Sequence, residues 1–412
     1  MSQRIVIAGA SMGGLRAAER LRAAGFAGEI VAIGDETHLP YNRPPLSKEA
    51  LASEVTHGAV AFRLRPAVAD VTWQLGVPIA SADLAAGAVR LADGAELNYD
   101  GLVVATGMRP RRLPVPGPVL GRHVVRTLED AAALRAELLP GARVLVIGAG
   151  FIGCEVAATA RVLGCQVTVV APEAVPMLRP LGSELGAALQ RRHEAEGVRF
   201  LLGRTIGRFL GTGPAGDGRD DDATASETER VGGAELSDGT VVEADVVVEA
   251  VGSASNTEWL EGNGLDLSDG VLCDNALRVE GRSHLVAVGD VARFPNPRYD
   301  EVARRVEHWS IPTDTAKRAV VSLLADLGHV ERDPAPFAPL PTFWSDQYGL
   351  RIQSFGAPAL GGADIRVLEG DLDGEVVVGY HDGGELIGVV IIGFPSALAR
   401  YRNELMRTPA LA

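Results

Sequence analysis

The chain has 412 residues, of which 47% are hydrophobic, 22% charged and 5% aromatic, a composition typical of a globular protein with two or three domains. Its formal charge of -14 disfavours nucleic acid or an anionic membrane as the main partner. The three cysteines, Cys154, Cys165 and Cys273, include no C-x-x-C pair, and the longest late apolar run, residues 387–394, is far shorter than the about 18 residues of a membrane span. We therefore expect a cytoplasmic protein with no disulfide framework, no metal site and no membrane or nucleic-acid partner.

Two segments of the chain have the pattern of a dinucleotide-binding βαβ unit. Each begins with an apolar strand, residues 4–8 or 143–147, which runs into a glycine-rich loop and an alanine-rich helical pattern. The three key loop positions are Gly9, Ser11 and Gly14 in the first unit and Gly148, Gly150 and Gly153 in the second. Glycine there makes a tight turn, lets the backbone approach a pyrophosphate and lets helix and strand pack closely. One such loop is weak evidence, but two in one chain are strong evidence for dinucleotide binding.

An acidic residue about 20 positions after each loop is the expected partner of the adenosine ribose hydroxyls. Asp35 or Glu36 takes this place in the first unit. In the second unit the strand over residues 166–170 is followed by Glu173, slightly beyond the expected position. No arginine lies between residues 168 and 178 to meet a 2′-phosphate, so NADH is favoured over NADPH.

The fold is predicted to be α/β, with two Rossmann-like dinucleotide-binding domains and a small α+β C-terminal domain. Residues 102–107 and 246–252 each resemble the last strand of a nucleotide-binding half, so the second unit is expected to be inserted in the first. The predicted domains are 1–112 with 246–328, the insert 113–245, and the C-terminal domain 335–412.

Two further segments complete this organisation. Residues 211–233 carry almost no large apolar side chain and have Asp220, Asp221 and Asp222 at their centre, which predicts an acidic loop between two strands. A helical pattern over residues 312–327 and a proline-rich link, residues 333–341, precede a region of short strands and a terminal helix.

Six stretches together resemble the FAD-dependent pyridine-nucleotide:ferredoxin reductases of bacterial oxygenase systems, a branch of the glutathione-reductase-like superfamily. They are residues 40–48, 105–107, 148–155, 289–290, 305–309 and 342–348. The resemblance covers essentially the whole chain. It implies that FAD occupies the first unit and NADH the second.

The resemblance also implies roles for individual residues. Those around FAD would be Gly9, Ser11, Gly14, Asp35, Glu36, Arg43, Lys48, Ala105, Arg109, Asp290, His308 and Trp309. Those around NADH would be Gly148, Gly150, Gly153, Glu155, Glu173 and Gly252. Among them Glu155 would orient the nicotinamide, Lys48 would be its partner near the flavin N5 edge, and Trp344 would lie at the flavin edge. The alternatives are a helix-surface acid, an ordinary lysine and a core aromatic.

The cysteine positions separate branches of this superfamily. Disulfide reductases carry a redox cysteine where this chain has residues 46–48, and Ser47 cannot relay electrons. The flavin must therefore pass electrons to an external acceptor, and flavin can convert a hydride into single electrons for an iron-sulfur protein. The leading hypothesis is an NADH:ferredoxin reductase for a cytochrome monooxygenase or a ring-hydroxylating dioxygenase. A rubredoxin reductase and an NADH-binding signalling or interaction module remain open alternatives.

The expected partner is a [2Fe-2S] ferredoxin. Ferredoxins are usually acidic, so a reductase of charge -14 needs a local positive patch for docking. The candidate docking residues flank the segment 307–309 and are Arg298, Arg304, Arg305, Lys317 and Arg318. Solvated helix-end charges are an equally good interpretation of these residues.

Overall fold

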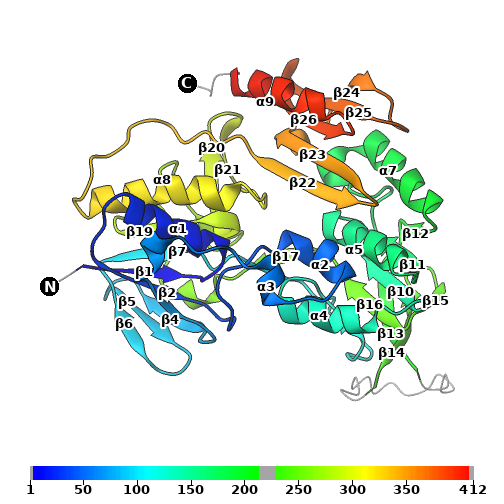
Figure 1. Ribbon diagram of the computed structural model, residues 1–412, viewed down its shortest axis with the longest axis horizontal. Coiled ribbons are helices and arrows are strands. Elements are labelled where there is room, and N and C mark those ends of the chain that lie inside the picture. Colours follow the sequence, from blue (N-terminus) through cyan, green and yellow to red (C-terminus); the bar gives the residue numbers. More distant parts are fainter. Residues whose placement is uncertain (1–2, 213–228, 408–412) are drawn as a thin grey trace.

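The computed structural model describes residues 3–212 and 229–407, which form two α/β domains and a third domain built on an antiparallel sheet (Figure 1). Most of the predicted acidic loop, with Asp220 to Asp222, lies outside the described residues. The two strands predicted on either side of it are β13 (Ile206–Gly211) and β14 (Val231–Leu236), and they pair with each other. In the two described ranges no helix is long and apolar enough to cross a membrane.

The first domain is built on a parallel five-stranded sheet, whose strands from the N-terminal part of the chain are drawn in blue and cyan in Figure 1. Its strand order is β19 (Leu285–Ala287), β7 (Gly101–Val104), β1 (Arg4–Ala8), β2 (Glu29–Ile33) and β3 (Thr72–Gln74). The four strands other than β3 are largely apolar and buried, because helices and loops cover both faces of a parallel sheet, whereas the edge strand β3 is partly exposed. Helices α1 (Met12–Ala23) and α8 (Ile311–Asp326) pack together against this sheet.

Smaller elements surround this sheet. One antiparallel sheet is β4 (Ile79–Asp83), β5 (Ala88–Leu91) and β6 (Glu96–Asn98), and another is β18 (Val271–Leu272), β20 (Ala292–Asn296) and β21 (Asp300–Arg305). The short helices are η1 (Pro44–Ser47), α2 (Glu49–Ala52), α3 (His57–Val60), η2 (Pro66–Val68), η3 (Glu258–Leu260) and η4 (Gly289–Val291). The helix predicted over residues 312–327 is α8, which begins at Ile311 with a proline in its first turn.

The second domain repeats the design of the first. Its parallel sheet has the order β12 (Arg199–Leu202), β11 (Gln166–Ala171), β10 (Arg143–Ile147), β16 (Val246–Glu249) and β9 (Arg122–His123). Its helices are α4 (Leu128–Glu137), α5 (Phe151–Val162), α6 (Leu178–Leu181) and α7 (Ser183–Ala195). Strands β13, β14 and β15 (Val241–Glu243) form a separate antiparallel sheet.

The predicted boundary after residue 245 is wrong by one strand. Strand β16 pairs in parallel with β10 and β9, so residues 246–249 belong to the second domain. The buried Glu249 at the end of this strand accepts hydrogen bonds from Arg112 and from Arg122 of the second domain. No local sequence pattern indicated these contacts, so the sequence did not show that β16 belongs to the inserted domain. The chain crosses between the domains through the two-stranded ribbon of β8 (Met108–Pro110) and β17 (Ser253–Ser255).

The C-terminal domain has a five-stranded antiparallel sheet and the helix α9 (Leu398–Arg407), as the sequence indicated. Its strands, in sheet order, are β22 (Thr342–Gln347), β23 (Leu350–Gly356), β26 (Glu385–Ile392), β25 (Val376–Asp382) and β24 (Asp364–Gly370); η5 (Pro358–Leu360) and η6 (Pro395–Ala397) complete it. Its sheet shares a hydrophobic core with the second domain, where Cys154 and Leu185 meet Phe343 and Tyr380.

The glycine loops have the geometry that close packing demands. Gly9 has φ +121°, and a Cβ there would lie 2.1 Å from the carbonyl oxygen of Ala105. Gly148 has φ +102°, with the oxygen of Ala250 at 2.2 Å from a Cβ. A Cβ on Gly150, by contrast, would meet no atom within 4 Å, which leaves this face of the loop open to a ligand.

A Gly9→Ala variant should therefore lose stability in two ways. The positive φ costs about 1–2 kcal/mol for an L-residue, and the clash with Ala105 adds roughly 1–3 kcal/mol of overpacking. Gly25→Ala is the matched control, because Gly25 also has positive φ but open space around its Cβ. Urea unfolding measures both variants. Equal losses would mean that the close approach to Ala105 is no constraint.

Candidate functional site

A pocket opens where the first glycine loop leaves the parallel sheet of the first domain. It is lined by Gly9, Ala10, Ser11, Gly34, Asp35, Glu36, His38, Pro40, Tyr41, Arg43, Ala105 and Thr106. Six of the residues predicted around FAD are thus brought together here. The site lies at the carboxyl ends of β1 and β2, where doubly wound folds bind dinucleotides.

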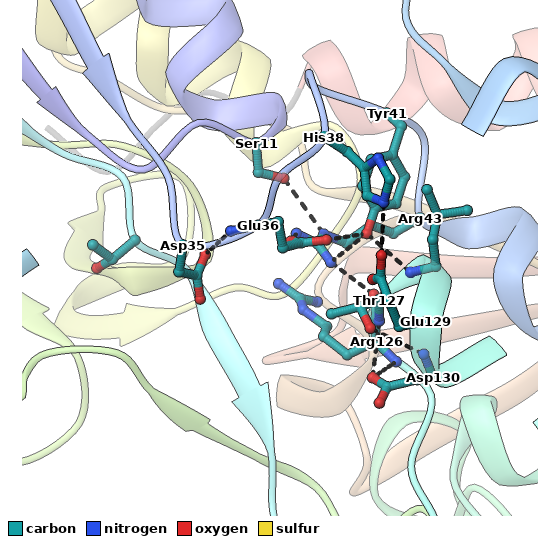
Figure 2. A network of polar contacts seen from close by, with 12 residues as sticks. Ser11, Asp35, Glu36, His38, Tyr41, Arg43, Arg126, Thr127, Glu129 and Asp130 are labelled. Carbon is teal, nitrogen blue, oxygen red and sulfur yellow. Dashed lines mark hydrogen bonds and ion pairs between the residues drawn. The ribbon is translucent and has the colours of Figure 1, made fainter. Parts of the chain in front are cut away.

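A polar network organises the wall of this pocket (Figure 2). The Arg43 guanidinium pairs with the carboxylate of Glu36, and the hydroxyl of Tyr41 donates to the other oxygen of Glu36. Arg43 also donates to the carbonyl oxygen of Arg126 at 2.7 Å and to Ser11 Oγ at 3.4 Å. Burial raises the pKa of Tyr41, so the hydroxyl stays a donor. Glu36 is thereby fixed in the wall, while Asp35 stays exposed at the rim.

Arg126 is a site residue that sequence reasoning missed. Burial lowers its pKa, and its Nε atom has no hydrogen-bond partner among the described residues. It lies close to Asp290, whose pKa burial raises to about 6 while the Arg126 charge opposes that shift. The only signal in the sequence is that Arg126 precedes Thr127, which forms a capping box with Asp130 and starts α4.

These features fit a bound FAD. The orphaned Nε of a buried arginine calls for an anionic or hydroxyl-bearing ligand, and the loop at Gly9 to Gly14 offers backbone amides at a helix N-terminus. His308 adds a second orphan, its Nδ1, and burial lowers its pKa to about 4, so the ring is neutral. Arg109 does not line the pocket; it pairs with Glu258 at the ribbon between the domains.

A buried ionic centre joins all three domains at the carboxylate of Glu155. Helix α5 places Glu155 one turn after the second glycine loop, with only 3% of the residue exposed. Its Oε2 accepts from Lys48 Nζ at 2.7 Å and from Ser47 Oγ at 2.6 Å, and its Oε1 accepts from Ser345 Oγ at 2.6 Å. The predicted pairing of Lys48 with Glu155 is therefore present. Ser47 and Ser345 are further residues of this centre that the sequence analysis did not identify. The only signal in the sequence is that they are adjacent to Lys48 and Trp344.

Trp344 lies beside this centre on the opposite face of β22. Its ring meets Trp309 edge-on at 5.1 Å, and the Arg351 guanidinium lies 5.5 Å above it. Trp309 is 40% exposed and donates from Nε1 to Asn42. The two predicted aromatic residues thus form a partly exposed pair.

On the second nucleotide loop, a Cβ on Gly148 would lie 2.2 Å from the oxygen of Ala250 and one on Gly153 would lie 2.0 Å from the oxygen of Gly148. A Cβ on Gly150 or Gly252 would meet no atom within 4 Å. Glu173 follows β11, and Arg179 Nη2 lies 3.9 Å from its Oε1. Arg179 thus directly follows residues 168–178, which contain no arginine. Glu173 is the first acidic residue after the end of β11.

The predicted docking arginines are largely occupied. Arg298 donates to the carbonyl oxygens of Ala338 and Leu405, and so ties the proline-rich link to α9. Arg305 is 13% exposed and pairs with Asp269 and Glu307, and Arg318, 11% exposed, pairs with Asp333. These intramolecular contacts leave the docking prediction for these three residues unconfirmed, because each of them also holds parts of the fold together. Arg304, paired with Asp300, and the exposed Lys317 remain at the surface.

The three cysteines are free and buried. Burial raises the pKa of Cys154 to about 12, so its thiol stays protonated and unreactive near neutral pH. Cys154 packs among apolar side chains as a small hydrophobe, next to the Glu155 centre but turned into the shared core. No thiol chemistry is available from these residues.

Comparison with known proteins gives a consistent result. The profile of the pyridine nucleotide-disulphide oxidoreductase family matches residues 3–316, and one described as reductase C-terminal matches residues 342–410. A probable ferredoxin reductase of Castellaniella defragrans is 34% identical, over 100% of this chain and 95% of the relative. The ferredoxin–NAD(+) reductase component of the p-cumate 2,3-dioxygenase system of Pseudomonas putida is 35% identical, over 97% and 92%. The crystal structure of a covalent putidaredoxin reductase–putidaredoxin complex matches with a TM-score of 0.86 and 30% identity, over 99% and 94%.

Removing one partner of the Lys48–Glu155 pair should be costly. Lys48→Met leaves a buried carboxylate without its cation, which we expect to lower the free energy of unfolding by roughly 3–5 kcal/mol. The double variant Lys48→Met/Glu155→Gln removes that charge and should recover most of the loss. Urea unfolding tests this, with the exposed Arg90–Glu96 pair as the control, where Arg90→Met should cost under about 1 kcal/mol. No recovery in the double variant would contradict the prediction.

Proposed function

The chain belongs to the pyridine nucleotide-disulphide oxidoreductase family, and we propose that it is an FAD-dependent NADH:ferredoxin reductase. In this reaction electrons pass from NADH through FAD to a [2Fe-2S] ferredoxin, which supplies a cytochrome monooxygenase or a ring-hydroxylating dioxygenase. The observation that carries the proposal is the buried Glu155 centre, which joins the second glycine loop to the Lys48 segment beside the first. The three free, buried cysteines support work in a reducing, cytoplasmic compartment.

FAD supplies the chemistry of accepting a hydride and releasing electrons one at a time. The residues of the chain bind and orient the reactants. The pocket at Gly9, with Arg43 and Arg126, would hold the pyrophosphate and sugar of FAD, and Asp290 would hold a ribityl hydroxyl. The loop at Gly150 would take the pyrophosphate of NADH at the N-terminus of α5.

Glu155 and Lys48 are the proposed orienting pair. The carboxylate would accept from the nicotinamide amide group, and the ammonium, tied to Pro44 as well as to Glu155, would lie near the flavin N5 edge. Because both side chains are buried and fixed, the geometry for hydride transfer is organised before NADH binds. The proposed preference for NADH rests on the carboxylate of Glu173, which repels a 2′-phosphate, although the exposed Arg179 lies 3.9 Å from it.

The docking surface for the ferredoxin is proposed around Trp344 and Trp309, with Arg304, Lys317 and Arg351 as the cations that remain at the surface. A positive patch steers an acidic partner against the overall charge of -14. A rubredoxin would use the same chemistry, so turnover with each class of iron-sulfur protein separates these acceptors. An NADH-binding interaction module would show no sustained turnover with either.

The hydride-transfer step tests the function directly. NADH should reduce the bound flavin in a single turnover, and Glu155→Gln should slow this step by about tenfold to hundredfold, because the nicotinamide loses its orienting carboxylate. Stopped-flow absorbance of the flavin follows the reaction. The variant must keep its FAD, which the visible spectrum reports. An FAD-replete Glu155→Gln protein that is reduced at the wild-type rate would refute the assignment.

The docking surface is tested by charge reversal. Arg304→Glu should lower the apparent on-rate for a [2Fe-2S] ferredoxin and flatten its dependence on salt, because steering is electrostatic. Reduction of a small uncharged dye by NADH should stay unchanged. Arg90→Glu is the matched control, since Arg90 is an ion-paired surface arginine on the β4–β6 sheet. Equal effects of the two reversals would show that only net charge matters.

A further inference from the structure

Strand β22 presents a line of buried polar side chains to the second domain. Along β22, exposure alternates so that Phe343, Ser345 and Gln347 are buried. Phe343 packs on Phe151, while Ser345 donates to Glu155 and Gln347 meets His193 of α7. Burial of Ser345 and Gln347 is tolerated because each has hydrogen-bond partners, and these partners include residues of the second domain.

These groups form one continuous hydrogen-bonded chain. His193 Nε2 lies 2.7 Å from Gln347 Oε1, Gln347 Nε2 donates to Ser345 Oγ at 3.0 Å, and Ser345 Oγ donates to Glu155 Oε1 at 2.6 Å. Behind His193, the hydroxyl of Tyr348 lies 3.4 Å from Nδ1. His193, Gln347, Ser345 and Glu155 are each exposed by 3% or less.

The chemistry of the donors sets the direction in which this series of hydrogen bonds runs. The amide oxygen of Gln347 can only accept, so His193 must carry its proton on Nε2 and use Nδ1 to accept from Tyr348. Burial lowers the pKa of His193, which favours the neutral ring, and its two hydrogen-bond partners select this tautomer. Every donor then points toward the carboxylate of Glu155, and aligned hydrogen bonds polarise and strengthen one another.

The turn at the end of β22 supports this arrangement. Tyr348 and Gly349 both have positive φ, +53° and +74°, in the tight turn that joins β22 to β23. A tyrosine in this conformation costs about 1–2 kcal/mol. The turn places the tyrosine ring against His193, with 5.1 Å between their centres. Backbone strain is thus accepted where it brings a donor to the end of the chain.

We propose that Ser345, held in place by Gln347 and His193, is a positioning residue for hydride transfer, so that the C-terminal domain completes the nicotinamide site. This inference rests on the proposed function. The hydroxyl of Ser345 fixes Oε1 of Glu155 from one side, while Lys48 and Ser47 hold Oε2 from the other. Without Ser345 the carboxylate can rotate away from the position in which it receives the nicotinamide.

The key variants are Ser345→Ala, which removes the hydroxyl, and Gln347→Met, which keeps the length of the side chain but removes its donor. Ser354→Ala is the matched control, because Ser354 is an equally buried serine on the neighbouring strand whose Oγ has no hydrogen-bond partner in the described residues. Holoprotein is used throughout. Thermal unfolding confirms that each variant is folded and the visible spectrum confirms that it holds FAD.

We expect Ser345→Ala to lower the rate constant of flavin reduction at saturating NADH by about tenfold or more, while the NADH concentration for half-saturation changes by less than threefold. Gln347→Met should give a smaller loss in the same parameter. Ser345→Thr, which restores a hydroxyl, should recover part of the rate. NAD+ binding, measured by calorimetry without turnover, should lose enthalpy in Ser345→Ala. Ser354→Ala should match the wild type.

The inference is overturned if Ser345→Ala reduces its flavin at the wild-type rate and binds NAD+ with the wild-type enthalpy. Its failure differs from failure of the proposed function, in which NADH would not reduce the wild-type flavin at all. In that case the ¹⁵N spectrum of His193 still decides the direction of the chain, since it requires no turnover. A proton on Nε2 of His193 supports the proposed direction of the hydrogen bonds, and a proton on Nδ1 contradicts it.

Discussion

The carboxylate of Glu155 is buried, and a buried charge is stable only when a counter-ion and hydrogen-bond donors surround it. This chain supplies them from every domain: Ser47 and Lys48 from the first, Ser345 from the third, around an acid of the second. The relative placement of the domains is therefore constrained by one charge, because moving any of them would leave it unsatisfied. The apolar core shared by the second and third domains provides adhesion, but apolar contact alone is non-directional and does not fix this geometry.

Much of this arrangement is readable from sequence, for a physical reason. A glycine that must approach a backbone oxygen within van der Waals contact has no substitute, so the loops at Gly9 and Gly148 are visible as patterns. The same holds for apolar strands and for the Lys48–Glu155 pair, whose residues lie in dense motifs. Arg126 and Ser345 were missed because their roles come from contacts between distant segments. Arg43 donates to the carbonyl oxygen of Arg126 across 83 residues, and Ser345 donates to Glu155 across 190. Local patterns do not encode such contacts.

The arginines predicted to dock the ferredoxin show a limit of reading charge from the sequence. A cluster of arginines in the sequence makes a positive surface only if no acidic side chain from elsewhere in the chain lies against it. Here Asp269 pairs with Arg305, and Asp333 pairs with Arg318. Likewise, the predicted domain boundary at residue 246 was wrong because the sheet to which β16 belongs is set by its pairing with β10 and not by its own composition. Neutralisation of a charge and membership of a sheet both depend on a pairing partner. A single sequence contains both partners but does not show which residues pair.

Strand β22 links the two ends of the proposed electron path. Its alternating side chains send Trp344 to the partly exposed aromatic pair and Ser345 to the buried carboxylate one residue later. A partner that binds at Trp344 therefore contacts the same rigid strand that holds Glu155, through a peptide unit whose length cannot change. A shift of β22 on docking would alter the hydrogen bond to Glu155 directly, without any intermediate element. On these proposals, positioning of the nicotinamide and recognition of the acceptor share one strand, in which Ser345 and Gln347 place two buried polar groups within an otherwise largely apolar contact with the second domain.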